Sequence, residues 1–142
     1  MTETTQDLKG QCLCGAIKIA AKTASTQLGA CHCSTCFKWT GGPLMALECG
    51  TQVDFEGEDQ ITVFDSSAWA ERGFCKHCGT HLFYRLKAQQ AYMMPVGIFD
   101  NVNPKEVIFD HQIFIEKKPD YYTFSNKTSD MTGAEVFAKF TV

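Results

Sequence analysis

The segment Cys31-His-Cys-Ser-Thr-Cys36 places three thiols within six residues, a density that apolar packing does not require. In an extended segment, residues two apart point to the same side, so Cys31 and Cys33 can face one metal ion. A turn after Cys33 brings Cys36 to the same ion. The segment therefore predicts a metal site with three soft ligands and an open fourth position, as in catalytic rather than structural zinc sites.

Two further cysteine pairs predict a second, closed site. Cys12 and Cys14 repeat the C-x-C spacing, and Cys75-Lys-His-Cys-Gly79 has the C-x-x-C-G form of a zinc knuckle, whose glycine permits the turn. A tetrahedral structural zinc site can be closed by the four cysteines of these pairs, Cys12, Cys14, Cys75 and Cys78. The chain is therefore expected to bind two Zn²⁺ ions, one structural and one labile and catalytic, the latter on Cys31, Cys33 and Cys36.

A substrate thiol can take the open position of the three-cysteine site, where zinc holds it as the nucleophilic thiolate. Three thiolate ligands weaken zinc as a Lewis acid, so the site suits thiol capture better than hydrolysis. The alternative is a second structural zinc completed by Cys49 or by a histidine. Cys49 follows an apolar run and is interpreted as a core residue, and His32 should point away from the metal. No acid–base role is assigned to His77, His81 and His111.

Composition and charge exclude several classes of function. The chain has 142 residues and a formal charge of −3, which provides no basic face for nucleic acid. It begins without a signal-peptide pattern and contains no apolar run that could span a membrane, so a cytoplasmic protein is expected. Eight cysteines in a reducing compartment favour metal over disulfides, which remain the alternative for a secreted protein. We expect a flexible tail over residues 1–9 and a single zinc-binding domain over residues 10–142.

Short alternating segments separated by turn residues predict a mainly β domain of antiparallel strands. The expected strands cover residues 10–22 with an interruption at Gly15, then 28–33, 43–49, 53–57, 61–65, 80–86, 92–99 and 111–116. A short helix is expected from Ser34, as its N-cap, to Trp39, and residues 129–140 can hold a helical turn.

Four basic residues flank the cysteine clusters, namely Lys38, Arg72, Lys76 and Arg85. They can screen the negative charge of the sites or bind the carboxylates of an anionic thiol, although a solvated surface charge is the default interpretation. Arg72 is favoured for function because it lies beside Phe74 and Cys75 rather than in an open charged run. Three aromatic residues can line a pocket near the open site or pack in the core: Phe37, Trp39 and Trp69.

In its ordered motifs the chain resembles the family of glutathione-dependent formaldehyde-activating enzymes and centromere protein V. The resemblance covers about residues 10–122 and rests on Gly10-Gln-Cys-Leu-Cys-Gly15, Cys31-His-Cys-Ser-Thr-Cys36 with Gly41, Phe64-Asp-Ser-Ser67, Arg72-Gly-Phe-Cys-Lys-His-Cys-Gly-Thr80, Gly97-Ile-Phe-Asp100 and His111-Gln-Ile-Phe114. It departs from the family at Phe37, where a polar or basic residue is common, and at Lys117-Lys-Pro-Asp-Tyr-Tyr122, where a tryptophan is common.

The resemblance implies a β-tent fold and the same two zinc sites. It also implies a carbon–sulfur lyase that condenses glutathione reversibly with formaldehyde to S-hydroxymethylglutathione. The hypothesis from the sequence is thus a two-zinc lyase acting on a thiol–aldehyde adduct, with no nucleic-acid or membrane partner. The competing hypothesis is a non-enzymatic, zinc-stabilised binding module in which both metals are structural.

Overall fold

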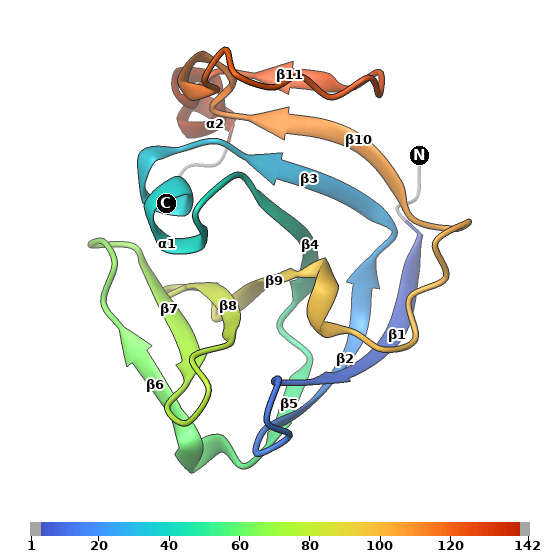
Figure 1. Cartoon of the computed structure of the whole chain (residues 1–142), viewed down its shortest axis with the longest axis vertical. Helices are drawn as coiled ribbons and strands as arrows, with labels where there is room; N and C mark the ends of the chain where they lie inside the picture. The colour runs from blue at the N-terminus through green and yellow to red at the C-terminus, as the bar shows by residue number, and fades with distance from the viewer. Residues whose placement is uncertain (1–3, 140–142) are drawn as a thin grey trace.

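A computed structural model of the chain describes residues 4–139, and their strands form two sheets (Figure 1). The smaller sheet has the strand order β1-β2-β5, all antiparallel. Its strands are β1 (Thr5–Gln11), β2 (Lys18–Ser25) and β5 (Val53–Glu56).

The larger sheet has eight strands in the order β11-β10-β3-β4-β9-β8-β7-β6. They are β3 (Gln27–Cys31), β4 (Leu44–Gly50), β6 (Ile61–Phe64), β7 (Ala70–Cys75), β8 (His81–Leu86), β9 (Ala91–Pro95), β10 (Ile108–Ile113) and β11 (Ser129–Met131). Only β10 pairs in parallel within the described chain, with β3 and with β11. The prediction of a mainly β, mainly antiparallel fold is confirmed.

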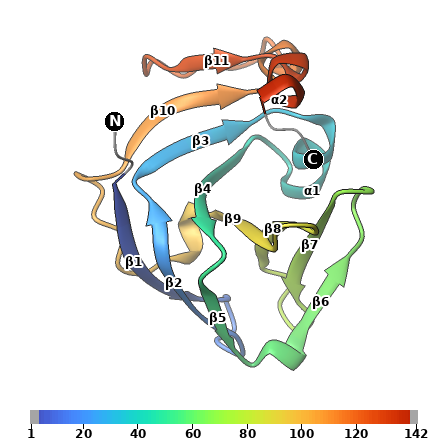
Figure 2. The ribbon, with the colours of Figure 1, turned by 180° about the vertical axis from the view of Figure 1, so that it is seen from behind.

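Helical segments are short. They are α1 (Ser34–Thr40), η1 (Glu58–Gln60), η2 (Val96–Ile98), η3 (Ile115–Lys117) and α2 (Gly133–Lys139). In both views α1 lies between the end of β3 and the β6–β7 hairpin (Figure 1, Figure 2). Within residues 4–139, none of these helices has the length and apolar character to cross a bilayer.

The two sheets share one hydrophobic core. Strand β2 contributes Ile19 and Ala21 from alternate positions, and the larger sheet contributes Leu47, Phe83 and Met94, all at most 3% exposed. Alternation places these side chains on the inner faces because successive residues of a strand point to opposite sides.

The expected tail over residues 1–9 is wrong for residues 5–9, which belong to β1. Leu8 on this strand is 1% exposed, and Gly10 pairs with Phe99 of the segment after η2. A Cβ at Gly10 would lie 2.0 Å from the carbonyl oxygen of Ile98, so this approach requires glycine. The strand was missed because it lies at a sheet edge and buries few apolar side chains. Residues 1–3 and 140–142 lie outside the described residues.

The boundaries of α1 also differ from the prediction. Cys33 rather than Ser34 is the N-cap, and its sulfur accepts from the backbone N–H of Cys36 at 3.4 Å. The helix ends at Thr40 and is capped by Gly41, whose φ of 82° lies in the left-handed region that glycine adopts without strain. A side chain of the predicted site thus also starts the helix.

Candidate metal centres

Four cysteines from two distant hairpins meet at one point. Cys12 and Cys14 lie in the turn between β1 and β2, whereas Cys75 and Cys78 lie at the turn between β7 and β8. Their four sulfurs lie within 4.8 Å of one another, and the Cys12–Cys14 and Cys14–Cys75 distances are both 3.7 Å. Tetrahedral coordination with Zn–S bonds of about 2.3 Å gives sulfur–sulfur distances of about 3.8 Å. This four-cysteine cluster therefore fits a tetrahedral metal ion.

Glycines and backbone amides shape both turns of the four-cysteine cluster. Gly15 and Gly79 have φ angles of 80° and 78°, and the N–H of Gly79 donates to the carbonyl of Cys75 at 2.8 Å. The N–H groups of Ile17 and His77 donate to the sulfurs of Cys12 and Cys75, each at 3.4 Å. These contacts place amide dipoles toward sulfurs that carry negative charge when they bind metal.

Thr80 joins the two hairpins, a role that the sequence interpretation missed. Its hydroxyl oxygen accepts from the N–H of Leu13 at 3.0 Å and lies 3.1 Å from the sulfur of Cys78, to which the O–H donates. This hydrogen bond is the main reason that the pKa of Cys78 falls to about 5. The sequence contained one sign of this role, a residue with a hydroxyl group directly after the C-x-x-C-G turn.

The second cluster is local. Cys31 ends β3, Cys33 caps α1 and Cys36 lies in its first turn, which brings their three sulfurs within 4.8 Å of one another. Among residues 4–139, no further Cys, His, Asp or Glu joins this three-cysteine cluster as a fourth ligand. The expected grouping of these three cysteines is what the structure shows.

The three thiols act on one another electrostatically. Hydrogen bonds from the thiols of Cys31 and Cys36 lower the pKa of Cys33 to about 2, with a smaller contribution from the charge of Arg72. The same hydrogen bond raises the pKa of Cys31. One sulfur therefore carries negative charge readily, and a cation is needed before all three can do so.

Cys49 does not complete the three-cysteine cluster. It is fully buried in the core, as predicted, and belongs to neither sulfur cluster. Burial raises the pKa of its thiol to about 12, so the residue behaves as a small apolar side chain.

His32 points away from the neighbouring sulfurs, as predicted. It is 1% exposed, and its Nε2 and Nδ1 lie 2.8 Å from Oε1 of Gln112 and 2.7 Å from the hydroxyl of Tyr122. Gln112 donates its amide N–H to Thr128, so its oxygen accepts from Nε2–H of His32 and the Tyr122 hydroxyl donates to Nδ1. This network fixes the segment between Cys31 and Cys33.

The remaining histidines lie outside both clusters. Burial lowers the pKa of His81 to about 4, and its ring packs edge-on against Trp39 with centroids 5.4 Å apart. His77 is exposed and hydrogen-bonds to Gln60, and His111 bonds to Asp110 from a strand inside the sheet rather than at its edge.

Of the four basic residues, Arg72 reaches the three-cysteine cluster. Its side chain extends from β7 and is 2% exposed, and its Nη2 donates to the sulfur of Cys36 at 3.4 Å. Arg85 instead forms a partly buried pair with Glu71 and also bonds to Tyr92, so it is not the free surface charge that was expected. Lys38 and Lys76 are exposed.

A groove of about 310 Å³ lies along α1, the helix that carries Cys36. Its lining comes from α1 and the end of β6: Ser34, Thr35, Lys38, Trp39 and Phe64. The rings of Trp39 and Phe64 stack with centroids 5.9 Å apart and form an apolar wall. Two of its lining residues, Ser34 and Thr35, stand between Cys33 and Cys36 in the sequence.

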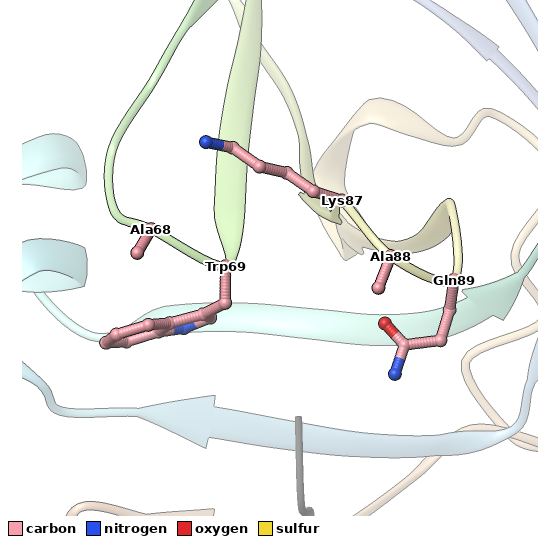
Figure 3. A pocket seen from close by; sticks show the side chains of 5 residues that line it. All are labelled: Ala68, Trp69, Lys87, Ala88 and Gln89. Carbon is pink, nitrogen blue, oxygen red and sulfur yellow. The ribbon is translucent and has the colours of Figure 1, made fainter.

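The other two predicted pocket aromatics lie elsewhere. Phe37 packs near His32 and Tyr122, with centroids 6.1 and 6.4 Å away. Trp69 borders a different hollow of about 550 Å³ together with Ala68, Lys87, Ala88 and Gln89 (Figure 3). The charge of Lys87 is paired with Asp65, and Trp69 contacts Phe137 of α2.

Comparison with known proteins identifies the family. The family model described as glutathione-dependent formaldehyde-activating enzyme matches residues 7–117, and the chain belongs to this family. An uncharacterized lyase of Schizosaccharomyces pombe is 37% identical over 92% of this chain and 94% of its own length. A candidate glutathione-dependent formaldehyde-activating enzyme of Podospora anserina is 29% identical over 58% of this chain, which spans 41% of that protein.

A crystal structure of a Rhodobacter sphaeroides protein has a similar fold. Its TM-score is 0.58 at 24% identity, and the match covers 69% of this chain and 93% of that protein. The family resemblance inferred from the cysteine motifs is confirmed by these comparisons.

Proposed function

We propose that this protein is a carbon–sulfur lyase that adds a thiol reversibly to an aldehyde, with glutathione and formaldehyde as the leading pair. The observation that carries the proposal is the three-cysteine cluster, which has no fourth protein ligand among residues 4–139. Membership of the formaldehyde-activating family and the 37% identity to a lyase support the reaction class.

The ligands suit zinc at both clusters. All seven are cysteine sulfurs, the soft donors that zinc takes in structural and catalytic sites alike. Cys12, Cys14, Cys75 and Cys78 would hold the structural ion, and Cys31, Cys33 and Cys36 the catalytic one. When bound to the three-cysteine cluster, zinc would keep a fourth, substrate sulfur deprotonated at neutral pH.

The residues of the groove orient the thiol substrate. Glutathione has two carboxylates and a peptide backbone, and Lys38 supplies a cation for one carboxylate while Ser34 and Thr35 supply hydroxyl groups. Trp39 and Phe64 provide an apolar wall for its aliphatic segments.

The bond changes are those of hemithioacetal formation. The substrate thiolate attacks the carbonyl carbon of formaldehyde and forms the carbon–sulfur bond, while the π electrons of the carbonyl move to its oxygen. A proton from water completes the S-hydroxymethyl product. The reverse reaction returns this proton to water and breaks the carbon–sulfur bond. Cys31, Cys33 and Cys36 gain and lose no bond to carbon in either direction.

Exchange spectroscopy by NMR tests the proposal directly. The interconversion of glutathione with formaldehyde and their adduct should be faster with the wild-type protein than without it. Cys33→Ser should lose this acceleration, because it removes one of three ligands, whereas Cys49→Ala should retain it, because it removes a thiol that belongs to neither cluster. Two inert zinc ions and no acceleration by the wild-type protein would instead establish the non-enzymatic binding module.

A further inference from the structure

The guanidinium of Arg72 is buried without a carboxylate partner. Its side chain is 2% exposed and forms no ion pair with a carboxylate in the described part of the chain. Its Nε and Nη1 atoms are buried and have no hydrogen-bond partner among residues 4–139. Arginine stays protonated in proteins, and an unpaired buried charge is strongly unfavourable. The guanidinium therefore requires a negative partner of another kind.

Cys36 provides that partner. Nη2 of Arg72 donates to its sulfur at 3.4 Å, and the rings of Tyr84 and Trp39 lie 5.1 and 6.0 Å from the guanidinium carbon. The aromatic rings hold the guanidinium in place because its cation interacts with their π faces. The hydrogen bond is strongest when the sulfur is a thiolate, which is the form that binds metal.

The charges of the site show what Arg72 changes. Three thiolates and a divalent ion have a net charge of −1, and the guanidinium brings the total to zero. When a thiolate binds as the fourth ligand, the total charge becomes −1. Without Arg72 the total charge would be −2, in a partly buried site. A neutral fourth ligand leaves the total unchanged. Arg72 therefore favours an anionic ligand over a neutral one.

We infer that Arg72 is a positioning residue that holds the Cys36 thiolate and makes the three-cysteine site select a thiolate as its fourth ligand. This inference rests on the proposed function, because it takes a thiol as the ligand. It differs from direct recognition of a substrate carboxylate, since the guanidinium is buried behind Cys36 and acts on every thiolate alike.

Ligand binding to the cobalt(II)-substituted protein tests the inference without turnover. Both sites are filled with cobalt, and absorption is followed during titration with glutathione, with 2-mercaptoethanol, which lacks carboxylates, and with imidazole, which is neutral. Arg72→Met should weaken the binding of both thiols about tenfold or more, as expected for loss of a hydrogen bond to a charged group. The binding of imidazole should be unchanged. It should also shift the sulfur-to-cobalt absorption.

Two further variants serve as an intermediate case and as a control. Arg72→Lys keeps the charge but loses the planar fork, so its thiol affinities should lie between those of the wild type and Arg72→Met. Lys18→Met removes an exposed cation from β2 and should bind all three ligands like the wild type. If Arg72→Met does not fold, the ratio of thiol affinity to imidazole affinity is compared between Arg72→Lys and the wild type instead.

Three results would overturn the inference. In the first, Arg72→Met binds all three ligands as the wild type does. In the second, its binding of the thiols and of imidazole is weakened equally. In the third, only its binding of glutathione is weakened, which would mean that Arg72 binds a substrate carboxylate. A wild-type protein that binds no thiol would overturn the proposed function itself. A wild-type protein that binds thiols, with Arg72 variants that bind them equally well, would overturn only the role of Arg72.

Discussion

The two cysteine clusters are built from the same ligand type but are stabilised in different ways. The four-cysteine cluster joins a hairpin of the small sheet to a hairpin of the large one, and Cys14 and Cys75 are 61 residues apart in the chain. Its sulfurs receive hydrogen bonds from backbone amides and from Thr80. The three-cysteine cluster lies within six residues at the junction of β3 and α1, and its charged partner is the buried Arg72.

Under the proposed function, this difference assigns a structural role to the four-cysteine cluster and a chemical role to the three-cysteine cluster. A metal ion in the four-cysteine cluster connects two sheets, so its loss removes a long-range link of the fold. A metal ion in the three-cysteine cluster connects residues that the strand-to-helix turn already brings together. Metal loss there should leave most of the fold intact, which frees the site for ligand exchange.

The largest expected effect is the contrast between Cys75→Ser and Cys33→Ser. Cys75→Ser should unfold the protein at room temperature, because structural zinc contributes on the order of 10 kcal/mol of apparent folding free energy. Cys33→Ser should bind one zinc ion instead of two and remain folded. Circular dichroism during thermal unfolding and metal analysis measure both. Unfolding of both variants would contradict the division of roles.

An acid-dependent loss of stability is expected at His81, which follows the four-cysteine turn and packs against Trp39 on the helix that carries Cys36. Its pKa is lowered by burial to about 4, so between pH 6.5 and 4 the unfolded chain binds a proton that the folded chain does not. The free energy of unfolding should therefore decrease as the pH falls through this range, by on the order of 3 kcal/mol.

Urea unfolding from pH 7 to pH 4 measures this effect, with His81→Gln as the reference. Because acid also releases metal from both clusters, the two proteins are compared only at pH values at which metal analysis finds both ions still bound. The difference between their curves isolates His81, and parallel curves would show that the histidine is not buried in its neutral form.

Thr80→Val should weaken the four-cysteine cluster alone. The substitution keeps the shape of the side chain but removes the hydrogen bonds to Cys78 and to the N–H of Leu13. The free energy of unfolding should fall by about 2 kcal/mol, and zinc should leave this cluster faster. Zinc transfer to a chromogenic chelator measures both release rates, and equal acceleration at both clusters would argue against a local role.

Tyr122→Phe should have the smallest effect and act on the three-cysteine cluster. It removes the hydroxyl that donates to Nδ1 of His32, between two of the ligands. A cost of about 1 kcal/mol in unfolding free energy is expected, with a modest rise in the zinc dissociation constant of that site. Competitive zinc titration measures it, and an unchanged constant would show that the His32 network does not hold the ligand segment.

The sequence predicted which cysteines cluster and missed the residues that surround them. C-x-C and C-x-x-C spacings fix the separation and direction of sulfurs locally, so each local group followed from the chain alone. The joining of the two distant pairs followed from the four ligands that a closed zinc site needs. Thr80 was missed because its hydroxyl acts on a hairpin distant in sequence. The strand that includes Leu8 was missed because its polar residues face solvent at a sheet edge.

The sequence by itself determined the three-cysteine cluster, the two cysteine pairs of the other cluster, the short-stranded β character and the inward position of Cys49. These properties depend on spacing and on alternation along single segments. Only the tertiary structure decided which of four cations contacts Cys36 and which of three aromatics borders the groove. Strand pairing sets these contacts: the register of β7 in the large sheet brings Arg72 to α1, and no local pattern encodes that register.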